Sequence, residues 1–248
     1  MTARIFIVSC VALAASSPVA AQSDAAPNWN GGYVGVNLGY GGGDSKYSYS
    51  GSANADGTNP VSGRLRQSSS GVLGGGQIGY NLETSRGLVF GLETDLAASD
   101  IGGRTNFANT GASGSTGSAN LRSKIDYLGT VRARVGPAIF GGRLLPYVTG
   151  GFAYGGVKSS DQTCYGCSAS NYTTNESTRT GWTLGAGAEY ALDPHLSIKT
   201  EYIYTDLGSE TISNNGTAYD VPGAALYNAT VREKSTANIV RVGLNYRF

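Results

Sequence analysis

The stretch that decides the fold is residues 235–248, which read STANIVRVGLNYRF. From Val240 onward, alternate positions carry large apolar side chains, and the positions between them are mostly small or charged. A repeat of two residues predicts a β-strand with two chemically different faces. The apolar face comprises Val240, Val242, Leu244, Tyr246 and Phe248, and the opposite face comprises Ile239, Arg241, Gly243, Asn245 and Arg247.

The same alternation recurs in seven earlier segments, each about as long as a membrane-crossing strand of roughly 9–11 residues. The fifth segment is apolar on both faces, so its register stays open. Gly contributes 38 of 248 residues, and helix-forming stretches are almost absent, which indicates an all-β chain. The seven segments are residues 33–40, 72–82, 88–98, 125–135, 145–154, 182–192 and 196–207.

The connections between these segments alternate in length. Short turns are expected at residues 84–86, 136–143 and 193–194, whereas long polar stretches such as 44–70 and 208–234 join the other segments. Short periplasmic turns and long surface loops are the layout of an outer-membrane barrel. Loops of this length are uncommon in compact soluble domains. The sequence therefore predicts an eight-stranded antiparallel up-and-down transmembrane β-barrel with four long, solvated extracellular loops.

The N-terminus has the features of a secretory signal peptide. Arg4 precedes a short apolar run, and Ala20 and Ala21 are small residues at the expected cleavage position. We therefore expect a signal peptide at residues 1–21 and a barrel domain at residues 22–248. Removing the signal takes away one of 18 basic residues and none of 17 acidic residues, which leaves a mature charge of 17 − 17 = 0. A neutral chain offers no electrostatic basis for binding nucleic acid.

Charged residues and glycines share the face opposite the apolar one. Five acids and five bases lie there, and an eight-stranded barrel has an interior that side chains fill. Opposite charges can neutralise one another in such a lumen, and glycine leaves room for long side chains. We expect a lumen charge network formed by Glu93, Asp95, Asp126, Arg132, Arg134, Glu189, Lys199, Glu201, Arg241 and Arg247.

Two other functions are consistent with the pattern. A narrow porin would pass small polar solutes along the charged lumen. A soluble ligand-binding barrel of lipocalin type would turn the apolar face inward. The porin would differ from a plugged barrel by conducting ions across a bilayer. The lipocalin-type barrel would differ from both by occurring in the soluble fraction and not in the outer membrane.

Little in the chain suggests catalysis or a cofactor. Cys164 and Cys167 are spaced C-Y-G-C, which in an exported protein favours a small loop disulfide. A zinc site needs four ligands, and His195 is the only histidine. That histidine falls at a predicted periplasmic turn, away from the outer leaflet where a lipid hydrolase would act. We expect no enzyme activity, no metal and no cofactor.

Four motifs occur in a characteristic order. Residues 28–40 read NWNGGYVGVNLGY, 129–136 read GTVRARVG, 146–151 read PYVTGG, and 201–208 read EYIYTDLG. They resemble motifs of the porin-like outer-membrane immunogenic proteins, eight-stranded OmpA-like barrels common in alphaproteobacteria. The resemblance spans most of the mature chain. It implies an outer-membrane surface protein with a structural or antigenic role, and the family has no established catalytic residues to carry over.

The resemblance also implies partners. The aromatic chain end, with Tyr246 and Phe248, looks like the C-terminal assembly signal that the barrel-assembly machinery reads. Outer-membrane lipids and lipopolysaccharide would surround the apolar face. Host or surface ligands would meet the loops.

Overall fold

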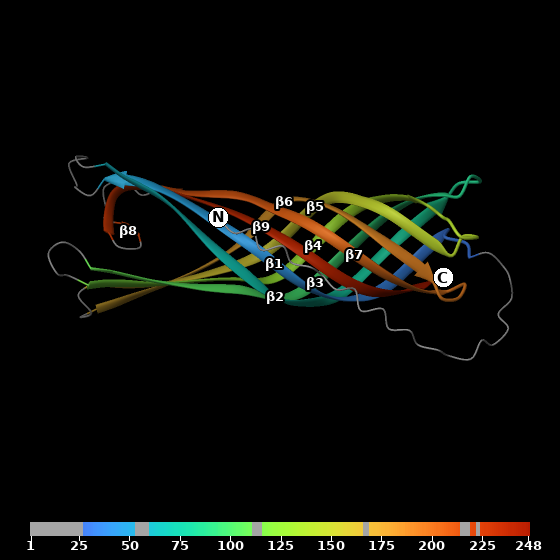
Figure 1. The fold of residues 1–248 in the computed structure, drawn as a ribbon, viewed down its shortest axis with the longest axis horizontal. Coiled ribbons are helices and arrows are strands. Elements are labelled where there is room, and N and C mark those ends of the chain that lie inside the picture. The colour runs from blue at the N-terminus through green and yellow to red at the C-terminus, as the bar shows by residue number, and fades with distance from the viewer. Residues whose placement is uncertain (1–26, 53–59, 111–115, 166–168, 214–218, 222–223) are drawn as a thin grey trace.

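The computed structural model describes residues 27–52, 60–110, 116–165, 169–213, 219–221 and 224–248. All regular structure in these residues is β-strand (Figure 1). The strands are β1 (Gly31–Ser52), β2 (Pro60–Glu83), β3 (Leu88–Thr110), β4 (Thr116–Pro137), β5 (Leu144–Tyr165), β6 (Ala169–Ala191), β7 (Leu196–Ser213), β8 (Tyr219–Val221) and β9 (Ala224–Arg247).

Eight of these strands close into one antiparallel barrel. Neighbours pair in the order β1-β2-β3-β4-β5-β6-β7-β9, and β9 pairs back to β1 from Tyr33↔Arg247 upward. The short β8 pairs only with the start of β9, among the strands described. A sheet that closes on itself has no unpaired edge, which is what a strand in lipid requires. The predicted eight-stranded barrel is confirmed.

The strands extend well beyond the lengths expected from the sequence. The β1–β2 pairing continues to Ser52↔Pro60, so most of residues 44–70 is a β-hairpin and not an irregular loop. These extensions carry polar residues on both faces, and hydrophobic periodicity therefore gives no signal there. Pairing still satisfies their backbone N–H and C=O groups, which makes a long hairpin more stable than an open loop.

The barrel divides into two sheets at one end. The β2–β3 pairing stops at Ser70↔Gly102, and the β6–β7 pairing stops at Trp182↔Asp206, while the other pairs continue. Above these two seams lie the β1 sheet (β2, β1, β9 and β7) and the β4 sheet (β3, β4, β5 and β6). They project to the left in Figure 1, the first in blue to cyan and red, the second in green to gold. We call this the hairpin end, and the opposite end the turn end.

The apolar face points outward, as predicted. On β9, Val242 is 50% exposed whereas Ile239 is 1% exposed. The register of the fifth expected segment is resolved, because Val148 and Phe152 point outward while Tyr147 is buried. This outward arrangement is opposite to that of a lipocalin-type barrel. Among the described residues, no helix is long and apolar enough to span a membrane.

Candidate functional site: the barrel lumen

The inner face of β9 passes through every layer of the lumen. Because side chains alternate along a strand, every second residue points inward. From the turn end upward, Arg247 meets an aromatic ring, Asn245 a polar cluster, Arg241 an ionic cluster, and Ile239 an apolar layer. The strand alternation thus stacks four different chemical environments along one barrel axis.

Glu93 is at the centre of the ionic cluster. Its carboxylate accepts hydrogen bonds from Lys199 Nζ at 2.8 and 2.9 Å, from the Tyr33 hydroxyl at 2.8 Å, and from the Arg132 guanidinium. Arg241 Nη2 lies 3.5 Å from the same carboxylate. All five side chains are buried, so protein groups replace the water that these ions would otherwise bind.

Two further carboxylates complete the cluster. Glu201 accepts from Arg241 Nε at 2.6 Å and from the Tyr147 hydroxyl at 2.7 Å. Asp95 lies 3.1 Å from both Arg132 Nη2 and Arg241 Nη2. Three carboxylates therefore face the three cations Arg132, Lys199 and Arg241. Mutual neutralisation offsets the large cost of burying each charge.

A second ion pair lies closer to the turn end. Arg134 Nη1 contacts Glu189 Oε2 at 2.8 Å, and Glu189 also accepts from Ser197 and Asn245. The Arg134 guanidinium carbon lies 4.8 Å from the Tyr33 ring centroid and 5.2 Å from that of Tyr147. Two rings and a carboxylate thus hold this cation in a fixed position.

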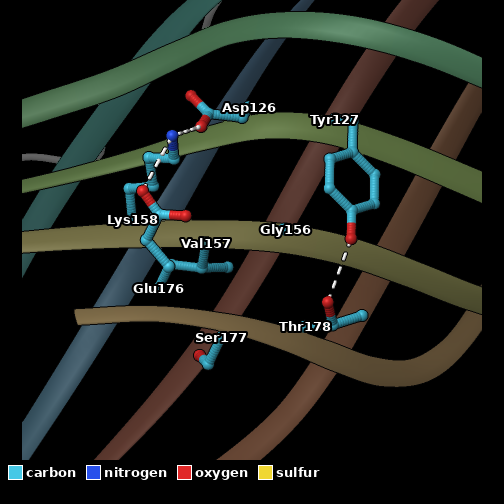
Figure 2. Close-up of a pocket in the computed structure, with 8 residues that line it drawn as sticks. All are labelled: Asp126, Tyr127, Gly156, Val157, Lys158, Glu176, Ser177 and Thr178. Atoms are coloured by element: carbon cyan, nitrogen blue, oxygen red, sulfur yellow. Dashed lines mark hydrogen bonds and ion pairs between the residues drawn. The ribbon is translucent and has the colours of Figure 1, made fainter.

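Two of the ten residues expected in the charge network form no ion pair with any described residue inside the lumen. Asp126 pairs at the barrel surface with Lys158 (3.1 Å), as Figure 2 shows, because a β-bulge between Ile125 and Tyr127 changes which side chains point inward. Arg247 is buried in the lumen, but its guanidinium lies 4.2 Å from the Trp29 ring centroid and makes no salt bridge with any described carboxylate. The expectation that Asp126 belongs to the lumen network is wrong. Arg247 lies in the lumen as expected, but next to an aromatic ring and not in an ion pair with any described carboxylate.

Glycines provide space for the long lumen side chains. A Cβ on Gly91 would lie 2.9 Å from Arg134 Cγ, and one on Gly243 would lie 3.2 Å from Lys199 Cε. A Cβ on Gly39 would lie 2.8 Å from Arg241 Cβ. Glycine at these positions therefore allows the charged side chains to cross the lumen.

Two apolar layers enclose the charges, and the sequence patterns did not predict them. At the turn end, Trp29, Val89, Leu145, Tyr147 and Ala191 form one cluster, with Trp29 Nε1 bonded to the Gly142 carbonyl at 2.7 Å. Toward the hairpin end the second cluster comprises Leu73, Ala97, Ile101, Leu128, Ala153, Val157, Ile203, Leu207, Ala237 and Ile239. Inward-facing Ile239 was a signal for it, and Ile101 was another, because it continues the inward alternation of Ala97 and Ser99 on β3.

Other expected residues are located as follows. His195 lies at the turn end, where Nδ1 is 2.9 Å from the Arg247 carbonyl oxygen. Within the described ranges, no group of three or more His, Cys, Asp and Glu residues is arranged to hold a metal. The signal peptide at residues 1–21 lies outside the described residues, and so does Cys167, so the structure does not bear on the Cys164–Cys167 bridge.

Comparison with known proteins decides the family. The family model described as the outer membrane protein beta-barrel domain matches residues 8–248. The chain belongs to this outer-membrane β-barrel family. Among its relatives, the 31 kDa outer-membrane immunogenic protein of Brucella melitensis is 42% identical over 233 residues, covering 94% of this chain and 89% of the relative. The 25 kDa outer-membrane immunogenic protein of Brucella abortus is 30% identical over 256 residues, covering 100% of this chain and 96% of the relative.

A solved structure supports the fold of this outer-membrane β-barrel protein. The outer membrane protein OprG from Pseudomonas aeruginosa superposes with a TM-score of 0.50 at 14% identity, covering 90% of this chain and 98% of OprG. The resemblance to outer-membrane immunogenic proteins is confirmed by the Brucella relatives. The family is one of outer-membrane β-barrels. Such barrels have short turns in the periplasm and long connections outside, so the turn end is assigned to the periplasm and both sheets to the cell exterior.

Proposed function

We propose that this protein is a structural and antigenic component of the bacterial surface, with a lumen closed to solutes and no enzyme activity. The observation that carries the proposal is the sequence of layers along β9, in which an apolar cluster lies on each side of the neutral ionic cluster. An ion or polar solute would have to lose its water to pass the layer of Ile101 and Ile239.

The lumen has little free volume beside its upper apolar layer. A cavity next to the upper apolar layer, lined by Ile101, Ser123 and Ser235, measures about 10 Å³. That is near the minimum needed for one water molecule. The small size of this cavity supports a closed barrel at this layer and counts against the narrow porin.

Planar-bilayer recording tests this part of the proposal. The folded mature protein should give no reproducible conductance steps. A variant with Ile101→Gly and Ile239→Gly, checked for folding by heat-modifiable migration on detergent gels, serves as the opened control. Reproducible steps from the wild type that change when lumen residues are substituted would establish the porin instead.

The surface role rests on the two extracellular sheets and on the immunogenic relatives. Antibodies against the mature protein should label intact cells, and protease should cut only in the extracellular sheets. We expect host or surface ligands to bind at these sheets. Labelling that requires permeabilised cells would contradict the proposal.

A further inference from the structure

Cations concentrate on the outer surface of the two extracellular sheets. Their positions alternate with buried residues such as Ser45, Ser123 and Ser235, which shows that they point away from the barrel axis. They account for nine of the 18 Lys and Arg residues in the chain. We call them the cationic belt: Lys46, Arg64, Arg66, Arg104, Arg122, Lys124, Lys158, Arg232 and Lys234.

The strand register places like charges of the belt directly opposite each other. Arg104 pairs with Arg122 across β3 and β4, and Lys124 pairs with Lys158 across β4 and β5. On the β1 sheet, Lys46 lies opposite Arg66 on one side and Lys234 on the other. Direct cross-strand pairs of equal charge are destabilising unless an anion lies between them.

Protein carboxylates neutralise only part of the belt. Lys158 Nζ lies 3.1 Å from Asp126 and 2.9 Å from Glu176 (Figure 2), and Lys124 Nζ lies 2.9 Å from Asp100. The hydrogen bond to Asp100 raises the pKa of Lys124, which keeps that ammonium charged.

Arg104 and Arg122 are exposed and form no salt bridge with any described residue, and the same holds for Lys46 and Arg66. These four positively charged side chains are therefore available to bind an external anion.

A hollow of about 540 Å³ lies at the β2–β3 seam, beside the unpaired arginines. Arg104, Arg122, Lys124 and Lys158 line it, together with Ser70 and with Asp100, the carboxylate that pairs with Lys124. Two guanidinium groups and nearby ammonium groups around a concave surface match a phosphate, because guanidinium binds phosphate oxygens in a bidentate manner.

The height of the hollow identifies the source of the phosphate. Tyr127 covers Gly156 on the outer face, where its hydroxyl lies 3.0 Å from that of Thr178 (Figure 2). Aromatic residues of this kind mark the membrane interface. Lys158 follows Gly156 by two residues on the same face, which at about 3.3 Å per residue places it only a few ångströms beyond that boundary. A lipid headgroup therefore reaches the lower edge of the belt at Lys158. Arg104 and Arg122 lie two residues further along their strands, about 7 Å beyond, where the phosphates of a large glycolipid headgroup extend.

We infer that the cationic belt binds the phosphate groups of the outer-leaflet glycolipid, with Arg104 and Arg122 as the principal contacts at the β2–β3 seam. The site lies outside the lumen and does not depend on whether the barrel conducts solutes. Bound headgroups would supply the anions that the opposed cations lack and would anchor the extracellular sheets at the membrane surface.

The experiment measures binding of lipid A with two phosphates to the full mature barrel in detergent micelles, with dephosphorylated lipid A as the comparison ligand. The test variant is Arg104→Gln with Arg122→Gln. The matched control is Arg86→Gln with Arg143→Gln, which removes two positive charges at the periplasmic end. Heat-modifiable migration verifies that every variant is folded.

The wild type and the control should bind phosphorylated lipid A equally, and the test variant should bind roughly tenfold more weakly. Added salt should reduce the difference, because exposed charges are screened. Equal binding by the test variant, or equal binding of dephosphorylated lipid A, would overturn the inference. So would binding of soluble heparin without any of lipid A, which would indicate a soluble polyanion. Bilayer conductance tests the closed lumen separately.

Discussion

Arg179 on β6 forms an ion pair with Glu233 on β9, with 2.5 Å between Nη2 and Oε2, although these strands are not hydrogen-bonded neighbours. The pair lies above the seam where β6 and β7 separate, and each side chain is 9% exposed. Tyr47 donates a hydrogen bond to the same carboxylate from β1. The β1 sheet and the β4 sheet are therefore connected by side chains where the backbone no longer connects them.

A double-mutant cycle measures this connection. Arg179→Gln and Glu233→Gln should show a coupling free energy of about 1–3 kcal/mol in urea unfolding, because the pair is largely desolvated. The matched cycle uses Lys158 and Glu176, which are half exposed and should couple by about 0–1 kcal/mol. Equal coupling in the two cycles would show that the buried pair does not hold the sheets together.

The ionic cluster should be sensitive to removal of one member. Glu201→Leu leaves Arg241 and Lys199 without one of their carboxylates, so the free energy of unfolding should fall by about 3–5 kcal/mol. Asp126 lies outside the cluster, so Asp126→Asn should lower the free energy of unfolding by less than about 1 kcal/mol. Urea titration in micelles measures both. A similar decrease in the free energy of unfolding for the two variants would indicate that Asp126 belongs to the ionic cluster.

Inner and outer glycines should respond differently to a methyl group. Gly39→Ala would put a Cβ 2.7 Å from the Val240 carbonyl oxygen, and should destabilise the barrel by about 1–3 kcal/mol. Gly76→Ala meets only the Gly35 carbonyl oxygen, at 3.8 Å, and should be neutral or slightly stabilising. Unfolding free energies compare the two variants, and a tolerated Gly39→Ala would contradict the packing described for Arg241.

Depth in the membrane should control the cost of a charge on the outer face. Leu92 and Leu82 are 60% and 59% exposed, but Leu82 lies next to the periplasmic turn. In liposomes, Leu92→Arg should lower the free energy of unfolding by about 2–4 kcal/mol, and Leu82→Arg should lower it by about 0–1 kcal/mol. Equal costs would argue that this face does not meet the acyl chains.

The terminal phenylalanine should matter for assembly more than for stability. Phe248 is 75% exposed and Phe140 in a periplasmic turn is 77% exposed, so either truncation to Ala removes little buried area. Both variants should refold in detergent with unchanged unfolding free energy. In cells, Phe248→Ala should lower the amount of folded barrel in the outer membrane severalfold, and Phe140→Ala should not. A normal amount of folded Phe248→Ala barrel in the outer membrane would contradict recognition of this residue by the assembly machinery.

The sequence predicted the membrane-crossing part of the fold because lipid imposes a strict alternation there. Val240 and Arg241 illustrate it, since neighbours with opposite solvation must point to opposite faces. Alternation also assigned Glu93, Asp95, Arg132 and Lys199 to one face, where the structure brings them together. Outside the membrane both faces of each hairpin are polar, so the extension of β1 to Ser52 left no periodic signal.

A bulge accounts for the misplaced Asp126. A bulge adds one residue to one strand and reverses the inward and outward positions beyond it. Asp126 lies at such a point. Ile101 does not, because the inward positions of β3 alternate without interruption from Glu93 to Ile101. The composition of a single strand does not reveal a bulge, because it is defined by the register with its neighbour.

The division of the extracellular part into two separately hydrogen-bonded sheets affects how immune selection acts on this protein. A hairpin tip in the β1 sheet can change length or sequence without altering backbone pairing in the β4 sheet. Conformational epitopes on the two halves can therefore diverge independently, so an escape mutation in one half leaves the antibody targets of the other intact. A vaccine antigen that presents both halves would require two separate escape events.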